Sequence, residues 1–175
     1  MVIMMKIKGG VDSPIGYLNV TADGKLMPEV VCIKREESNA KLPTRGSAGA
    51  AGWDLYANAS DPARVITINP HTSHLVSTGV AAAIPEGCVG LLFARSGLAA
   101  RQHLRPSNCV GVIDSDYRGI IKVSLHNDSD EPQMINDGDR IAQLVIVPFL
   151  PIDFKEVFEL DETDRGKGGF GSTGR

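Results

Sequence analysis

Residues 75–93 have the sequence Leu75-Val-Ser-Thr-Gly-Val-Ala-Ala-Ala-Ile84-Pro-Glu-Gly-Cys88-Val-Gly-Leu-Leu-Phe93, and this stretch indicates the fold class. Two short apolar runs, rich in strand-forming residues, flank a turn signal that contains proline and glycine. Comparable runs occur at residues 29–34, 64–68, 119–125 and 141–149, among ten prolines and nineteen glycines in total. No long segment shows the 3.6-residue period of an amphipathic helix. We therefore predict an all-β domain, a sandwich or jelly-roll barrel.

Other parts of the chain depart from this strand pattern. One short helix is predicted over Ser96–Leu104, with Ser96 as its N-cap. Residues 1–28 read as an N-terminal extension of unknown role, and residues 29–160 as the β-barrel domain. Residues 161–175 are rich in glycine, which loses much backbone freedom on ordering, so we predict a flexible C-terminal lid.

Composition excludes several classes of function. A chain of 175 residues is long enough for one domain with a sizeable core. Its net charge of −3 argues against a nucleic-acid partner. Cys32, Cys88 and Cys109 are scattered and odd in number, so the sequence predicts neither a disulfide framework nor a zinc site. No apolar run is long enough to span a bilayer, and we expect a cytoplasmic protein without a membrane partner.

The C-terminal lid carries the side chains that a nucleotide would need. It reads Arg165-Gly-Lys-Gly-Gly-Phe-Gly-Ser-Thr-Gly174. Arg165 can bind anionic oxygens, Phe170 offers a flat stacking surface, and Ser172 and Thr173 supply hydroxyl groups. The segment is therefore interpreted as a phosphate lid that becomes ordered when the ligand binds. The alternative is a disordered solubilising tail.

The central segment Asn108–Gly119 suggests a β-hairpin whose mouth holds a ligand. Two glycines bracket a β-branched pair, an acid, a second acid and an aromatic residue. Asp114 and Asp116 would share one face of a straight strand. A carboxylate in such a mouth is suited to activating a water molecule. For Asp116 we favour the alternative that it pairs with Arg118 or caps a turn.

Three further segments contain candidate polar residues. Arg95-Ser96-Gly97 lies where a strand meets the predicted helix, so its amides and Arg95 could bind an anion. An ordinary strand–helix junction would have the same sequence character. Asp54 and Gln143 are each isolated in mostly apolar runs, and such residues are more often buried and satisfied by local hydrogen bonds.

Five segments together resemble a known family. They are AGWDLYA (51–57), RSGLA (95–99), NCVGVIDSDYRG (108–119), GDRIAQL (138–144) and RGKGGFGSTG (165–174). Their order and approximate spacing are similar to those of the five motifs of the trimeric dUTP diphosphatases, the dUTPases. The resemblance covers residues of about 29 to 174. The chain departs from the family pattern at two positions. Ala94 stands where a proline commonly precedes the second motif, and Trp53 replaces the usual smaller aromatic residue of the first motif.

The resemblance implies a jelly-roll homotrimer with C-terminal arm exchange and composite active sites. It also implies hydrolysis of dUTP to dUMP and pyrophosphate, by water attack on the α-phosphorus with Mg²⁺. That reaction limits uracil in DNA and supplies dUMP. Two alternatives remain, a dCTP deaminase-like member of the superfamily and a non-catalytic dUTP-binding regulatory protein. Asp114 and the complete glycine-rich tail favour the dUTPase.

The same resemblance implies roles for individual residues. Asp114 would be the catalytic base, and Asp54 would hold water molecules of a Mg²⁺ carried in by the triphosphate. Tyr117 would pack against deoxyribose and exclude a 2′-hydroxyl, while Phe170 would stack on uracil. The implied substrate-binding residues are Arg95, Ser96, Gly97, Asn108, Gly111, Val112, Ile113, Tyr117, Lys122, Gln143, Arg165, Phe170, Gly171, Ser172 and Thr173.

Overall fold

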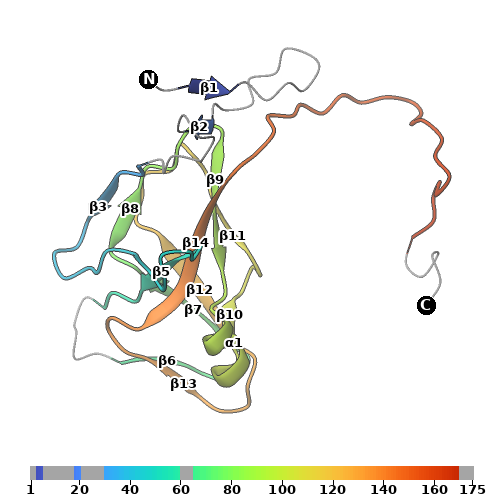
Figure 1. Ribbon diagram of the computed structural model, residues 1–175. Coiled ribbons are helices and arrows are strands. Elements are labelled where there is room, and N and C mark those ends of the chain that lie inside the picture. The colour runs from blue at the N-terminus through green and yellow to red at the C-terminus, as the bar shows by residue number, and fades with distance from the viewer. Residues whose placement is uncertain (1–2, 6–17, 21–29, 60–64, 170–175) are drawn as a thin grey trace.

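The regular secondary structure of the described residues is β-strand apart from one short helix. The computed structural model describes residues 3–5, 18–20, 30–59 and 65–169, with strands β1–β14 and helix α1 (Figure 1). In the N-terminal extension, β1 (Ile3–Met5) pairs antiparallel with β2 (Leu18–Val20). The all-β prediction is therefore confirmed. No helix among these residues is long and apolar enough to cross a membrane.

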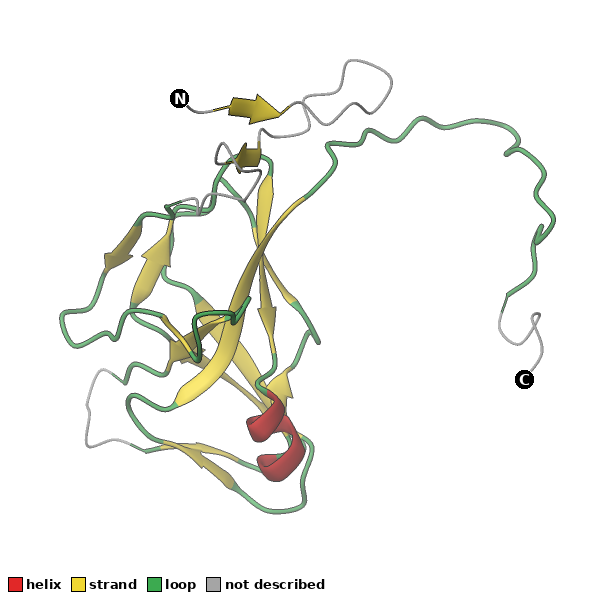
Figure 2. Cartoon of the chain, in the orientation of Figure 1, coloured by secondary structure: helices red, strands yellow, loops and turns green. Residues whose placement is uncertain are grey.

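Two larger sheets and two strand pairs build the barrel (Figure 2). The five-stranded sheet has the order β11-β9-β14-β5-β4, and the three-stranded sheet has the order β10-β12-β7. The first comprises β4 (Thr44–Arg45), β5 (Trp53–Tyr56), β9 (Cys88–Phe93), β11 (Gly111–Ile113) and β14 (Arg140–Pro148). The second comprises β7 (Ser73–Ser77), β10 (Leu104–Pro106) and β12 (Lys122–Asn127). The pairs are β3 (Ile33–Arg35) with β8 (Val80–Ala82), and β6 (Ile66–Ile68) with β13 (Gln133–Ile135).

The core lies between these sheets, and strand periodicity explains how it is filled. In β12, Val123, Leu125 and Asn127 are buried, while the residues between them are more exposed. Successive strand side chains point to opposite faces, so alternate residues of β12 enter the core. Val123 and Leu125 belong to one core cluster with buried residues of the other sheet, including Leu55 and Ile141. Removal of this apolar surface from water is the main stabilising contribution to the fold.

The predicted run at residues 75–84 forms two strands. β7 ends at Ser77 and pairs with β12, whereas β8 begins at Val80 and pairs with β3. Gly79 between them has φ +66°, and a Cβ there would lie 2.7 Å from the Cβ of Ala40. Only glycine suits this backbone conformation and this space. Gly79 thus allows the chain to leave the pairing of β7 with β12 and to enter the pairing of β8 with β3.

Helix α1 (Ser96–Gln102) differs at both ends from the prediction. Its N-cap is Arg95, which has extended dihedrals and whose carbonyl accepts bonds from the amides of Leu98 and Ala99. Ser96 is thus the first helical residue, and the prediction that it is the N-cap was wrong. The helix ends at Gln102, and its C-cap residue, His103, has a left-handed backbone with φ 55°. Leu104 then begins β10, where strand pairing with β12 replaces the predicted last turn.

Beyond β14 the chain leaves the barrel as an arm. Residues 149–169 have no strand or helix, and they extend away from the sheets (Figure 1). Near the end of the arm, Arg165 Nε donates to the carbonyl of Gly168, and the amide of Gly166 donates to the carbonyl of Thr163. Phe170, Gly171, Ser172 and Thr173 lie outside the described residues.

Candidate active site

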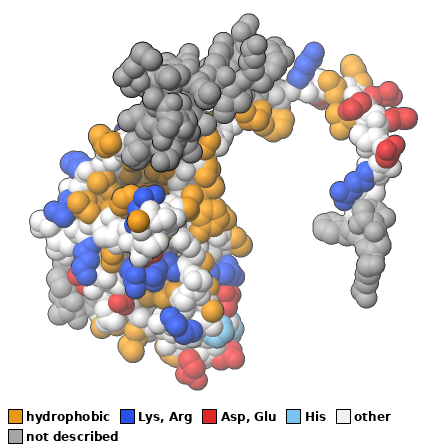
Figure 3. Space-filling model, viewed as in Figure 1, with side chains coloured by type: hydrophobic (Ala, Val, Ile, Leu, Met, Phe, Trp, Pro, Cys, Tyr) orange, Lys and Arg blue, Asp and Glu red, His pale blue; other side chains and the backbone are white. Residues whose placement is uncertain are grey.

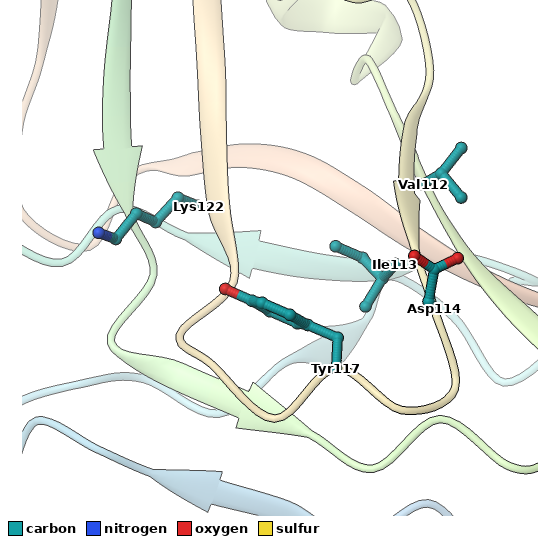
Figure 4. A pocket seen from close by; sticks show the side chains of 5 residues that line it. All are labelled: Val112, Ile113, Asp114, Tyr117 and Lys122. Atoms are coloured by element: carbon teal, nitrogen blue, oxygen red, sulfur yellow. The ribbon is translucent and has the colours of Figure 1, made fainter.

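A shallow pocket lies beside the end of β11. Its volume is about 170 Å³, and it is lined by Val112, Ile113, Asp114, Tyr117 and Lys122. Figure 4 shows the Tyr117 ring between the strand that carries Lys122 and the strand that carries Ile113, with Val112 directed away from the ring. The structure therefore brings these five predicted residues together.

A second pocket of about 190 Å³ continues from the first. It shares Val112, Ile113 and Lys122 with the first pocket. The remaining lining residues are Leu75, Leu92, Pro106, Asn108, Gly111, Val123 and Ser124. Asn108 and Gly111 are thus also beside the predicted site. Leu75 and Leu92 were not predicted as site residues, because apolar strand residues give no signal that separates a pocket wall from a core.

The gap that these pockets occupy lies between two sheets. β11 pairs with β9, whereas β12 pairs with β7 and β10. The predicted hairpin is therefore wrong, because the loop after Ile113 carries the chain from one sheet to the other. β11 is an edge strand of its sheet. An edge strand presents main-chain N–H and C=O groups that its single neighbour does not use, and these can bind a ligand.

Gly111 permits the close packing of this edge strand. It lies opposite Leu92 in the register of β11 and β9. A Cβ at this position would be 3.0 Å from the Cβ of Leu92. A larger residue would push β11 away from β9, so the glycine helps to set the width of the second pocket.

The loop after β11 presents Asp114 and Tyr117. The Tyr117 amide donates to the Asp114 carbonyl at 3.2 Å, and the Tyr117 hydroxyl donates to the Ile120 carbonyl at 3.0 Å. Both side chains are exposed at the pocket. An ion pair between Asp116 and Arg118 is absent from the described residues, since Arg118 donates to main-chain carbonyls. The suggestion that Asp116 pairs with Arg118 was therefore wrong.

Away from these pockets, Asp54 forms a polar cluster with Arg95 and Arg140. Asp54 on β5 is 9% exposed and accepts bonds from Arg95 Nε at 2.8 Å and from Arg140 Nη1 at 3.2 Å. Asp54 is therefore buried and satisfied, as an isolated acid usually is, but its partners are 41 and 86 residues away. Arg140 was not predicted as a site residue, because nothing in its local sequence distinguishes it from a surface arginine. Asp54 holds the guanidinium of Arg95 beside the start of α1.

Gln143 lies next to this group. In β14 it is opposite Asp54 of β5 on one side and Phe93 of β9 on the other. Its Nε2 donates to the Ala94 carbonyl at 2.9 Å. A Cβ at Gly52 would lie 2.6 Å from its Oε1, so the glycine makes room for the amide. Three neighbouring strands therefore bring the predicted residues Asp54, Arg95 and Gln143 together at the helix start.

The described residues contain no group of three or more His, Cys, Asp or Glu side chains that could hold a metal ion. The donor set near Arg95 offers one carboxylate, that of Asp54. A carboxylate has about four lone-pair sites, and the two arginine bonds leave some of them available. Asp54 thus fits water-mediated contact with a Mg²⁺ that keeps most of its water ligands.

Comparison with known proteins identifies the family. The dUTPase family model matches residues 38–174. A deoxyuridine 5′-triphosphate nucleotidohydrolase of Corynebacterium glutamicum is 49% identical over 152 residues, covering 85% of this chain and 99% of that protein. The enzyme of the same name from Candida albicans is 49% identical over 137 residues, covering 77% and 82%. This chain belongs to the dUTPase family.

Solved structures agree with this assignment. The dUTPase of Staphylococcus bacteriophage 80alpha with dUPNHPP has a TM-score of 0.71 and 31% identity, covering 85% of this chain and 100% of that chain. A variant dUTPase from phage phi11 of S. aureus, described with a structural Mg(II) ion, has a TM-score of 0.64 and 30% identity, covering 75% and 98%. The predicted fold class and the family resemblance are thus confirmed.

Proposed function

We propose that this chain is a dUTP diphosphatase, which hydrolyses dUTP to dUMP and pyrophosphate. The observation that carries the proposal is the shared pocket of Asp114, Tyr117 and the edge strand β11. Family membership supports the same reaction. The reaction would limit uracil in DNA and supply dUMP. We place it in the cytoplasm, because scattered cysteines without a pairing pattern favour a reducing compartment.

The two connected pockets suit a nucleoside. Asn108 and the main chain of Val112, Ile113 and Lys122 would read the uracil edge, with Gly111 allowing the close approach of the strand. Main-chain groups on an edge strand are rigidly placed, so they can reject a base with the wrong donor pattern or an added methyl group. Tyr117 would pack against deoxyribose and leave no space for a 2′-hydroxyl.

Asp114 would act as the general base. It follows β11 directly and is exposed at the pocket that the nucleotide would occupy. From there its carboxylate would orient a water molecule and take a proton as the water attacks the α-phosphorus. Positioned acid–base groups of this kind contribute about 10²–10⁴-fold to the rate.

The cluster of Asp54, Arg95 and Gln143 at the start of α1 would bind the phosphates. Arg95 supplies positive charge, Ser96 and Gly97 supply the first amides of the helix, and Gln143 would lie near the α-phosphate. Asp54 would hold water ligands of Mg²⁺ in addition to its two arginines. When bound with the triphosphate, Mg²⁺ would neutralise charge on the phosphate oxygens. Such sites work mainly by positioning and charge neutralisation.

We further propose a homotrimer with exchanged C-terminal arms. Along the arm, Phe154 is 96% exposed and Leu160 is 84% exposed, and Phe149, Leu150 and Ile152 are also exposed. An apolar stretch of this kind marks a surface that a partner covers. Figure 3 shows acidic side chains along the arm together with some Lys and Arg, and Lys and Arg side chains across the middle of the barrel face with acidic ones at its lower edge. The barrel of a second copy of this chain would cover the apolar side chains of the arm and present Lys and Arg to its acidic side chains.

Arm exchange would complete the site. Arg95 and Gln143 would come from one subunit, the Asp114 loop from a second, and the tail from a third. The tail would bring Phe170 onto uracil, with Arg165, Gly171, Ser172 and Thr173 at the β- and γ-phosphates. A symmetric trimer would then hold three equivalent composite sites.

Product analysis tests the reaction. The pure protein is incubated with each deoxynucleoside triphosphate and Mg²⁺, and products are separated by chromatography. We expect dUMP and pyrophosphate from dUTP, with dTTP and UTP as poor substrates. Asp114→Asn should lower turnover about 10²–10⁴-fold while dUTP still binds. The matched change Asp116→Asn should leave turnover within a few-fold of wild type. Near-normal turnover in Asp114→Asn would remove that residue from the role.

Complementation tests the shared site. Asp114→Asn with an intact tail is refolded together with a chain truncated at Asp164. In every mixed trimer one site pairs an intact loop with an intact tail. Random assembly makes about three quarters of trimers mixed, so about a quarter of sites should recover. Activity that stays at the level of the separate variants, with mixed trimers confirmed by mass, would contradict composite sites.

A further inference from the structure

Arg118 is an exposed arginine whose side chain folds back onto its own loop. Its Nη1 lies 2.7 Å from the Ser115 carbonyl oxygen and 2.8 Å from the Tyr117 carbonyl oxygen. One terminal guanidinium nitrogen carries two N–H groups in a fixed plane, so it can donate one hydrogen to each carbonyl. Both are charge-assisted bonds, which are stronger than neutral hydrogen bonds.

The loop is anchored to the barrel at its two ends, and within it Tyr117 donates to the carbonyls of Asp114 and Ile120. Before it, β11 is paired with β9. After it, Ile121 is fully buried, its amide donates to the Val80 carbonyl at 2.8 Å, and its carbonyl accepts the Thr78 hydroxyl at 2.7 Å. The residues between these anchors are exposed or partly exposed and belong to no strand. Such a segment is free to take several shapes unless contacts within the loop select one.

The two carbonyls that Arg118 binds are placed next to the two functional side chains. Ser115 directly follows Asp114, and the second carbonyl belongs to Tyr117 itself. Rotation of either peptide group would swing the Asp114 carboxylate or the Tyr117 ring to a new position. A shift of about 1 Å in a catalytic group can cost about 10²-fold in rate.

We propose that Arg118 is a positioning residue, which clamps the loop so that Asp114 and Tyr117 face the nucleotide together. Arg118 is not among the lining residues of either pocket, so it would act through the two carbonyls. The inference rests on the proposed dUTP hydrolysis and adds a determinant of both rate and sugar selectivity. Asp114 governs the rate and Tyr117 the selectivity, so loss of the clamp should reduce the two properties together.

The first test compares three variants in the full-length protein. Arg118→Met removes both donors and keeps a long stem, while Arg118→Lys keeps charge and donors. Arg35→Met is the matched control, because Arg35 is an exposed arginine on β3 outside the loop. For Arg118→Met we expect kcat for dUTP to fall about 10–100-fold and the dUTP-to-UTP ratio of kcat/KM to fall about 10-fold. Arg118→Lys should lie between this variant and wild type, and Arg35→Met should match wild type.

A second test separates positioning from general stability. Arg118→Ala is assayed with methylguanidinium chloride, at concentrations that leave wild-type activity and Tm unchanged. Restored turnover would support a clamp that a free guanidinium can rebuild. Unchanged kcat and selectivity in Arg118→Met, in a folded protein with active wild type, would overturn the inference. A rate loss explained fully by a lower Tm, without rescue, would also overturn it. Inactive wild type would instead overturn the proposed function.

Discussion

Asp54→Asn tests how the arginine pair beside the helix start is held. Both carboxylate oxygens of Asp54 accept guanidinium bonds, at 2.8 Å from Arg95 and 3.2 Å from Arg140. Asparagine has nearly the same shape, but it offers one carbonyl oxygen and one NH₂ group. The NH₂ group would face a guanidinium donor, and two positive charges would lose their counter-ion.

The expected loss of stability follows from the burial of the three side chains. The side chain of Asp54 is 13% exposed, that of Arg95 25% and that of Arg140 50%. Breaking a fully buried pair costs about 3–5 kcal/mol, whereas an exposed pair contributes about 0–1 kcal/mol. Because Arg140 is half exposed, we expect the free energy of unfolding to fall by about 2–3 kcal/mol. For a chain of this length, the Tm should fall by about 4–12 °C.

Intrinsic fluorescence suits the assay, because the single tryptophan, Trp53, precedes Asp54 in β5. Melting is followed at one fixed protein concentration, since the Tm of the proposed homotrimer would depend on concentration. The control is Asp130→Asn, whose side chain is 96% exposed in its pair with His71. It should change the free energy of unfolding by no more than about 0.5 kcal/mol. If Asp54→Asn melts like this control, the counter-ion argument is refuted.

A double variant locates the cause of the loss. Adding Arg140→Met to Asp54→Asn removes one of the two uncompensated charges. The second change should therefore cost less than Arg140→Met costs alone, with a coupling energy of about 1–2 kcal/mol. Strictly additive losses would show that Asp54 and Arg140 stabilise the fold independently.

Three other outcomes are expected. In Gly119→Ala the new Cβ would lie 2.5 Å from the Tyr117 hydroxyl, so kcat/KM for dUTP should fall at least about 10-fold as the ring is displaced. Asn127→Ala removes four hydrogen bonds of a fully buried side chain, and urea unfolding should show a loss of about 2–4 kcal/mol. The hydrogen bond from Arg105 holds the pKa of Asp128 below its ordinary value, so the stabilisation from this ion pair is present above that ordinary value and is lost as the pH falls through the lowered pKa. The Tm difference between wild type and Asp128→Asn should therefore shrink as the pH falls below about 4.

Local sequence patterns were enough to predict the all-β class and the pocket segment. Strand-forming runs between turn residues depend on neighbours in the chain, so they can be recognised without knowing what packs against them. Asp114 and Tyr117 lie three residues apart, which keeps them close in any compact loop. Their joint presence in one pocket was therefore predictable.

Long-range pairing decided the remaining features. The contacts of Asp54 with Arg95 and Arg140 depend on which strands become neighbours and in which register. The pairing of β11 with β9, which replaced the predicted hairpin, likewise depends on distant residues. The sequence alone determined where strands, turns and the pocket loop occur, because steric and hydrophobic preferences act between near neighbours. Only the tertiary structure decided which of these segments share a sheet, because that choice depends on how the whole core packs.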